Sequence, residues 1–230
     1  AISAYYGTRG IYFADVSGDG MADAIAVVDD GVLIRRSDNT LFLEIENWTN
    51  GAYYGTQGTF FADVTGDGKA DAIVNNAGRI TVRRSTGTRF NPNEDWTKGV
   101  FAGTRGNFFA DVNGDSKADA IVVNDDGVMV RLSDGSQFVT EQSWINEAFA
   151  GTQGTFFADV NGDGKADAVA VNDKMIIVRL SDRSQFAAPE DWTGTAFWGK
   201  RGTFFADVTG DGAADAVAVG DDTVWVRPAR

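Results

Sequence analysis

Residues 55–72 read Gly-Thr-Gln-Gly-Thr-Phe-Phe-Ala-Asp-Val-Thr-Gly-Asp-Gly-Lys-Ala-Asp-Ala, and this stretch occurs in five similar copies along the 230-residue chain. The other copies begin at Gly7, Gly103, Gly151 and Gly199, so the spacing is 48 residues each time. Self-similarity at such a fixed period indicates a repeat architecture. We therefore treat residues 1–230 as a single domain built from repeats 5–52, 53–100, 101–148, 149–196 and 197–230.

Short apolar runs within each repeat predict β-strands rather than helices. Residues 12–16 are rich in aromatic and β-branched side chains, residues 119–124 contain the apolar run Ala-Ile-Val-Val, and residues 128–132 alternate between two faces, with Val128 and Val130 on one and Met129 on the other. A fourth segment, 137–144, ends in Trp144, and clusters of Gly, Asn and Asp separate the four segments. Four short strands in a repeat of this length are typical of a β-propeller blade. The predicted fold class is all-β, a β-propeller of five four-stranded blades.

The fifth repeat stops before its fourth segment, so the last blade is predicted to lack its outer strand. Two interpretations remain open: a closed five-bladed ring whose last blade has three strands, which we favour, or a piece of a longer chain. A β-solenoid is disfavoured because its coils are usually shorter than this repeat.

Composition excludes many kinds of chemistry. The chain has no Cys and no His, which removes disulfides, zinc–thiolate sites, cysteine nucleophiles and histidine general bases. It shows no apolar run of about 18 residues, no basic-then-apolar leader and no basic stripe. We therefore expect no membrane insertion and no nucleic-acid partner, and a start at Ala1 is consistent with a processed mature protein or an excised module.

Each repeat also carries the loop Asp-Val-x-Gly-Asp-Gly-x-Ala-Asp, with Ser116 in place of the second Gly in the third copy. Side-chain oxygens occur at positions 1, 3, 5 and 9 and a backbone carbonyl is available at position 7, an alternation that suits a hard cation. An EF-hand is excluded because position 12 is Ala or Val and a strand follows. The predicted metal ligands are Asp15, Ser17, Asp19, Met21 and Asp23; Asp63, Thr65, Asp67, Lys69 and Asp71; Asp111, Asn113, Asp115, Lys117 and Asp119; Asp159, Asn161, Asp163, Lys165 and Asp167; and Asp207, Thr209, Asp211, Ala213 and Asp215.

The charge distribution favours calcium at these loops. Fifteen of the 33 acidic residues lie in them, so the rest of the chain is nearly neutral although the net charge is −13. Carboxylates crowded in triplets repel one another unless a cation neutralises them. We expect up to five structural calcium ions and an extracellular or secreted protein. The alternative is that the carboxylates cap backbone N–H groups in tight turns without metal.

The stretch Phe-Phe-Ala-Asp-Val-Asn-Gly-Asp-Gly-Lys-Ala-Asp-Ala-Val-Ala-Val at 156–171 resembles the FG-GAP or VCBS-type repeat, as do its four copies. The loop is similar to the calcium loops of integrin α-subunit propellers. In combination with the Trp-containing segments, the chain resembles the propeller lectins related to Psathyrella velutina lectin. That resemblance implies sugar pockets between neighbouring blades and N-acetylglucosamine-type ligands, although the lectin family usually has seven blades.

Sugar binding needs an aromatic platform with polar groups beside it. The Trp at the end of the fourth segment and the residue before the repeat Gly are candidates for the platform, and the residue two positions after that Gly is a candidate donor. If sites lie between one blade's Trp and the segment leading into the next blade, there are four of them. The alternative is that the repeated Trp belongs to the blade core. The predicted carbohydrate-binding residues are Trp48, Trp96, Trp144, Trp192, Tyr54, Trp198, Gln57, Arg105, Gln153 and Arg201.

The leading hypothesis is a non-enzymatic, calcium-stabilised lectin with several equivalent sites for glycans or glycoconjugates. The alternative is a non-catalytic structural or adhesion module of a larger secreted protein. A lyase or hydrolase is disfavoured because the adjacent carboxylates Glu94 and Asp95 would point to opposite faces of a strand.

Overall fold

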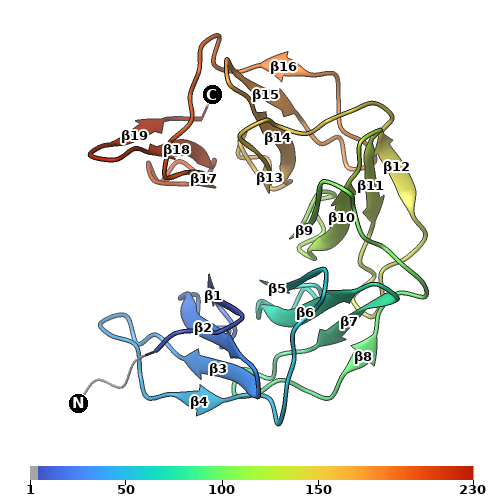
Figure 1. The fold of residues 1–230 in the computed structure, drawn as a ribbon, viewed down its shortest axis with the longest axis vertical. Helices are drawn as coiled ribbons and strands as arrows, with labels where there is room; N and C mark the ends of the chain where they lie inside the picture. The colour runs from blue at the N-terminus through green and yellow to red at the C-terminus, as the bar shows by residue number, and fades with distance from the viewer. Residues whose placement is uncertain (1–4, 230) are drawn as a thin grey trace. The chain divides into compact units, whose positions relative to one another are not determined.

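Antiparallel β-sheets make up the whole secondary structure of residues 5–229, the part of the chain that the computed structural model describes (Figure 1). The first sheet contains β1 (Gly10–Ala14), β2 (Asp23–Val28), β3 (Gly31–Arg35) and β4 (Glu46–Asn47). The second contains β5 (Gly58–Ala62), β6 (Asp71–Asn76), β7 (Arg79–Arg83) and β8 (Glu94–Asp95). The third contains β9 (Gly106–Ala110), β10 (Asp119–Val123), β11 (Val128–Arg131) and β12 (Gln142–Ile145). The fourth contains β13 (Gly154–Ala158), β14 (Asp167–Val171), β15 (Ile176–Arg179) and β16 (Glu190–Asp191), and the fifth β17 (Gly202–Ala206), β18 (Asp215–Val219) and β19 (Val224–Arg227).

Each sheet is a simple meander in which consecutive strands pair. The strand order is β1-β2-β3-β4 in the first sheet and is the same in the next three, whereas the fifth stops at β17-β18-β19. This up-and-down topology is that of β-propeller blades. The predicted fold class is confirmed, including the three-stranded last blade.

Several strand boundaries differ from the predicted ones by one or more residues. The first strand of the first blade ends at Ala14 rather than at residue 16, because Asp15 already begins the loop that follows. The fourth strand of the third blade covers only Gln142–Ile145, because residues 133–138 instead form a tight hairpin closed by an isolated bridge between Ser133 and Phe138.

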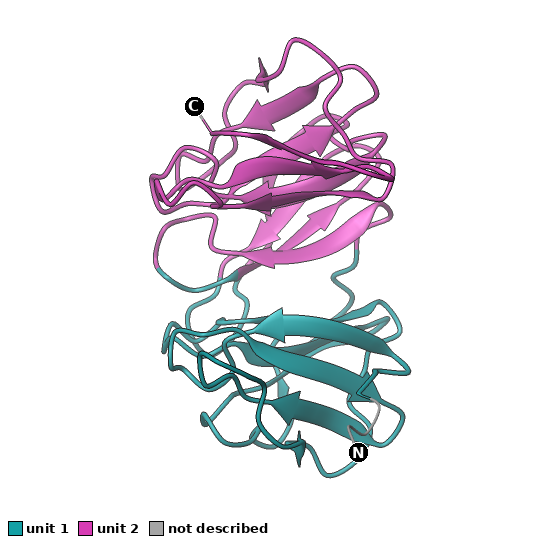
Figure 2. Cartoon of the chain, turned by 90° about the vertical axis from the view of Figure 1, so that its left-hand side faces the viewer, with its two compact units in different colours: residues 1–102, 116–118, 133–139 teal, residues 103–115, 119–132, 140–230 magenta. Residues whose placement is uncertain are grey.

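The chain divides into two compact units (Figure 2): residues 1–102, 116–118 and 133–139 form one, and residues 103–115, 119–132 and 140–230 form the other. In the first unit, the core contains Ile25, Val27, Trp48 and Phe90. In the second unit, the larger core cluster contains Val112, Ile121, Trp144 and Phe186. Strands that are apolar on both faces, such as β10, are buried along their whole length.

The joint between the first and second blades and the joint between the third and fourth blades use the same set of bonds. Between the first and second blades, Ala70 N–H donates to the Asp15 carbonyl (2.7 Å), Ser85 Oγ donates to the Val16 carbonyl (2.6 Å), and Phe90 N–H donates to the Trp48 carbonyl (3.2 Å). The joint between the third and fourth blades repeats this set with the donors Ala166, Ser181 and Phe186. The repeated sequence therefore builds a repeated joint.

No helix that could cross a membrane occurs between residues 5 and 229.

Candidate functional site

The aspartates at the ends of each loop are bound by backbone amides. In the first loop, Asp15 accepts N–H groups from Gly18 (2.6 Å) and Gly20 (2.7 Å). Asp23 accepts N–H groups from Ser17 (3.0 Å) and, across the sheet, from Ser37 (2.8 Å). The two glycines have φ values of 81° and 84°, a region that favours Gly, and this conformation turns their N–H groups toward the carboxylate.

The middle aspartate of the loop is more exposed, and in the second and fourth blades it meets a lysine. Lys69 Nζ lies 2.8 Å from a carboxylate oxygen of Asp67, and Lys165 Nζ lies 2.5 Å from one of Asp163. An ammonium group therefore neutralises part of the acidic charge of these loops. In the third loop, Ser116 occupies the position of the second Gly with a φ of 66°, a conformation that is uncommon for L-residues.

The last aspartate of the loop is fully buried, and in the first, second and fourth blades burial raises its pKa, so its charge is costly there. Burial is the largest cause that raises the pKa of Asp71 to about 7; the negative charges of Asp63 and Asp67 add to the shift, and the N–H of Ser85 opposes it. Burial likewise raises the pKa of Asp167 to about 6.

The donor set suits calcium by its chemistry, because each loop offers carboxylate, hydroxyl or amide, and carbonyl oxygens. In the geometry observed, however, the side chains point at backbone amides. Over residues 5–229 no three acidic side chains gather as a metal site. The hydrogen bonds thus match the turn-capping alternative raised by the sequence, and the ligand roles of the loop residues remain predictions.

The predicted tryptophans occupy two different environments. Trp48, Trp96 and Trp144 are 1–3 % exposed, and each meets a Phe ring edge-on, with ring centroids 5.1–5.3 Å apart. For these three, burial supports the alternative that the repeated Trp is blade core. Trp48 nevertheless borders a pocket of about 460 Å³. Trp192 is only partly buried and lines a separate pocket.

In four of the five repeats, the side chain at the predicted polar donor position contacts the carboxylate of an Asp that lies twenty residues further along the chain. Arg105 pairs with Asp125 (2.5 Å) and Arg201 with Asp221 (2.6 Å), and Gln153 Nε2 donates to Asp173 (2.6 Å). Arg9 forms the same kind of pair in the first blade. Such exposed pairs contribute little to stability, about 0–1 kcal/mol, so their donors can exchange toward a ligand.

The predicted aromatic Tyr54 borders a pocket of about 410 Å³. Tyr54 is 36 % exposed, and the guanidinium of Arg9 lies over its ring, 4.4 Å from the centroid. The preceding residue, the buried Tyr53, is held by its hydroxyl, which shares its proton between the carbonyls of Ala72 (3.2 Å) and Thr81 (3.0 Å). The platform therefore stands on a fixed part of the second blade.

Polar side chains from β6, β7, β8 and the residue before β8 complete this pocket. Arg79 Nη1 and Asp95 Oδ2 are 2.6 Å apart, and Asn76 and Asn93 also line the pocket. Aromatic surface beside mixed donors and acceptors is the arrangement that sugar recognition requires. We call this set the Tyr54 pocket: Tyr54, Asn76, Arg79, Asn93 and Asp95.

Sequence reasoning placed Tyr54 in a candidate site but missed Arg79, Asn76, Asn93 and Asp95 as its neighbours. A signal existed, because the position of Arg79 departs from the repeat. The other blades have Gly31, Gly127, Met175 and Thr223 there. Of the predicted partners, Gln57 and the tryptophans do not line the Tyr54 pocket.

Similar solved structures include a lectin from Agrocybe aegerita, described for its specific recognition of non-reducing terminal N-acetylglucosamine. It is 25 % identical to this chain, with a TM-score of 0.75 over 94 % of this chain and 61 % of the lectin. The Tc holotoxin pore of Photorhabdus luminescens matches at 15 % identity and a TM-score of 0.70 over 96 % of this chain and 11 % of that one, which shows a shared fold alone. The chain thus spans less than two thirds of either structure.

No curated protein matches the chain. The family model of the FG-GAP-like repeat matches residues 63–122, 111–170 and 159–218, which together make up more than half of the sequence. The chain is a member of the FG-GAP-like repeat family.

Proposed function

We propose that this chain is a non-enzymatic carbohydrate-binding protein whose ligands are glycans ending in N-acetylglucosamine. The observation that carries the proposal is the Tyr54 pocket, in which an accessible aromatic ring adjoins a charged pair and two amides. The similarity to the Agrocybe lectin supports the same ligand class, because that lectin recognises terminal N-acetylglucosamine.

Each residue of the pocket has a different role in sugar recognition. The exposed surface of the Tyr54 ring contacts the apolar face of the sugar, while Arg79 donates to hydroxyl or carbonyl oxygens. Asp95 accepts from hydroxyl groups, and Asn76 and Asn93 offer both a donor and an acceptor for the N-acetyl group. All five residues come from the second blade or from the segment leading into it, so one rigid sheet positions most of the site.

Calcium is proposed as a structural ion of the aspartate loops and the extracellular space as the site of action. The support is the oxygen-rich donor set and the concentration of fifteen carboxylates in five loops. The loop residues would hold the ion, and the bound ion would neutralise carboxylates that otherwise repel each other.

Titration calorimetry with a glycan ending in non-reducing N-acetylglucosamine tests this function. We expect saturable binding by the wild type and at least about tenfold weaker binding by Tyr54→Ala and by Arg79→Ala. Tyr6→Ala is the matched control, because Tyr6 is the counterpart of Tyr54 in the first blade and is 63 % exposed. The same glycan capped with galactose should not bind.

If neither glycan binds, the lectin proposal is refuted and the structural or adhesion module remains. Equal loss in Tyr54→Ala and Tyr6→Ala would refute the assignment to the second blade.

A further inference from the structure

Two arginines line the pocket of about 460 Å³ at the joint between the first and second blades. Arg83 belongs to β7, and the exposed Arg89 belongs to the hairpin that follows. No acidic residue of the described chain lines this pocket, although the net charge of the protein is −13. The local charge is therefore opposite to that of the protein as a whole.

The guanidinium group of Arg83 lies over an aromatic ring and has no other partner. It is 4.5 Å from the ring centroid of Tyr53. Among residues 5–229, none accepts a hydrogen bond from the guanidinium of Arg83 or of Arg89, and none forms an ion pair with either. A guanidinium carries five N–H donors in a planar fork that matches a carboxylate. Two cations are thus available to a ligand.

The equivalent joint between the third and fourth blades shows how the fold neutralises this position. The counterpart of Arg83 there is Arg179, whose Nη2 contacts a carboxylate oxygen of Glu147. The position of Glu147 is Gly51 in the first joint, and the position of Arg89 is a Gln in the third and fourth blades. The pair Arg83 and Arg89 has a formal charge of +2, whereas the pair Arg179 and Glu147 has none.

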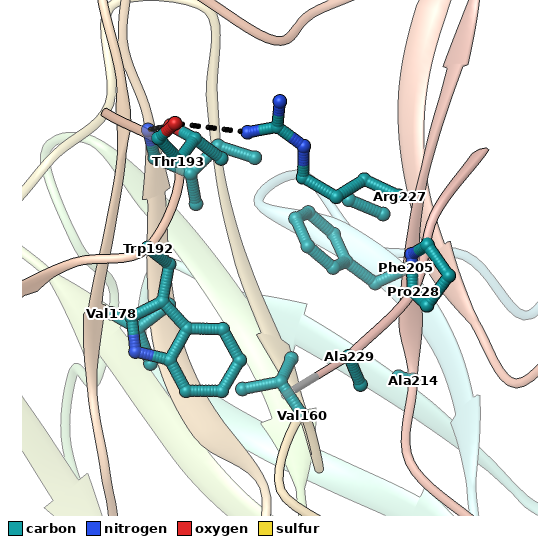
Figure 3. Close-up of a pocket in the computed structure, with 11 residues that line it drawn as sticks. Val160, Val178, Trp192, Thr193, Phe205, Ala214, Arg227, Pro228 and Ala229 are labelled. Carbon is teal, nitrogen blue, oxygen red and sulfur yellow. Dashed lines mark hydrogen bonds between the residues drawn. The ribbon is translucent and has the colours of Figure 1, made fainter. Parts of the chain in front are cut away.

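The counterpart of Arg83 in the last blade also has a partner within the chain. Arg227 Nη1 donates to the carbonyl of Thr193 (3.1 Å), the bond drawn in Figure 3. The second blade therefore differs from the fourth and the fifth, because only its arginine is left without a protein acceptor among these three.

The rest of the pocket is polar and offers both donors and acceptors. The side-chain amides of Asn47, Asn50 and Asn91 line it beside the buried Trp48. Each amide can donate to one hydroxyl and accept from another. A ligand with several hydroxyl groups would use all three amides, whereas the carboxylate of an acidic peptide would leave them without partners.

We propose that this pocket, the Arg83–Arg89 pocket, binds a sugar that carries a carboxylate, such as a hexuronate unit of an acidic glycan. The sugar carboxylate takes the role that Glu147 has at the other joint and accepts charge-assisted hydrogen bonds from Arg83 and Arg89. The three amides bind the ring hydroxyls. The volume lies in the range of small-molecule sites.

This site is distinct from the Tyr54 pocket. Arg83 lines both pockets, but the two share no other residue of the described chain. Arg89 lines only the Arg83–Arg89 pocket, so its replacement tests the new site by itself.

The test is a titration of the ¹⁵N-labelled 230-residue protein with glucuronate and with glucose, which differ only in the carboxylate. We expect glucuronate to shift the Nε–H signals of Arg83 and Arg89 in a saturable way, and glucose to bind at least about tenfold more weakly. Propionate, a carboxylate the size of a Glu side chain, should also bind at least about tenfold more weakly than glucuronate.

Three substitutions extend the test to the protein. Arg89→Gln introduces the residue of the third and fourth blades and should weaken glucuronate binding at least about tenfold. Asn47→Asp introduces the residue of the second and fourth blades and should weaken it as well, because the new carboxylate repels the ligand. Lys98→Gln is the charge control: Lys98 is exposed and lies outside this pocket, so glucuronate binding should stay unchanged.

Several results would overturn the proposal. They are no saturable binding of glucuronate, equal affinity for glucose, and equal affinity of the Arg89→Gln variant. Propionate binding as tight as that of glucuronate would show that the pocket takes a carboxylate of an acidic peptide and not a sugar. None of these probes contains N-acetylglucosamine, so failure here leaves the proposed function standing, and the first two results use only the wild-type protein.

Discussion

Phe90→Ala should destabilise the protein far more than Phe42→Ala, although the two residues occupy the same position in successive repeats. Phe90 is 6 % exposed and meets both Trp48 and Phe61. Truncating a buried Phe costs about 3–5 kcal/mol, because the lost transfer free energy adds to the energy of the cavity left behind.

Phe42 is 42 % exposed, and its ring lies 6.1 Å from that of Phe13, which is itself exposed. Phe42→Ala loses only part of the transfer free energy of a Phe side chain, because the ring is partly in water already, and it leaves no closed cavity. The expected cost is about 1 kcal/mol in the free energy of unfolding. The two variants should therefore differ by roughly 2–4 kcal/mol in the free energy of unfolding.

Equilibrium urea unfolding followed by tryptophan fluorescence measures this difference. Both substitutions lie in the first unit, so the same cooperative transition reports both. Equal destabilisation by the two variants would refute the reasoning that a Phe seated on the preceding blade's Trp holds the blades together.

Other predictions concern the joints and the loops. Ser85→Ala should cost about 1–3 kcal/mol in urea unfolding, because the fully buried carbonyl of Val16 loses its donor; a cost near zero would show that the hydroxyl is dispensable. In chelator, the folded-state pKa of Asp71, about 7, lies above the unfolded value of 3.8, so its charge costs stability progressively as pH rises from about 4 to about 7. Asp71→Asn should therefore gain stability relative to the wild type over that range, and a pH-independent difference between the two would contradict this. Millimolar calcium should raise the melting temperature of chelator-stripped protein, and an unchanged melting curve would refute the structural calcium ions.

The number and type of blades could be predicted from the sequence because a strict period imposes the same meander on each repeat. Strand ends were less predictable, since they depend on local hydrogen bonds. Asp15 leaves the first strand because its carboxylate binds the N–H groups of Gly18 and Gly20. Val16, which follows Asp15, is apolar, so the apolar pattern alone extends the strand to residue 16.

The periodic pattern could not decide which repeated residues bind ligand. In the sequence, a Trp that recurs every 48 residues is compatible with a place in the blade core and with a sugar-binding platform. The structure shows a Phe ring packed against Trp48, Trp96 and Trp144, which supports the core interpretation for these three. The aspartate spacing similarly predicts a tight oxygen-lined turn but not whether the oxygens face a cation or backbone amides. The Tyr54 pocket was only partly predictable. Tyr54 was found because it occupies a repeated position, whereas Arg79 is specific to the second repeat and a search for repeated residues does not find it.

A crystal of the protein soaked with N-acetylglucosamine tests the central claim, carbohydrate binding in the second blade, most directly. The account predicts sugar density against the Tyr54 ring, with hydrogen bonds to Arg79 and Asp95. Sugar bound at another blade with the Tyr54 pocket empty, or no bound sugar at saturating concentration, would contradict it.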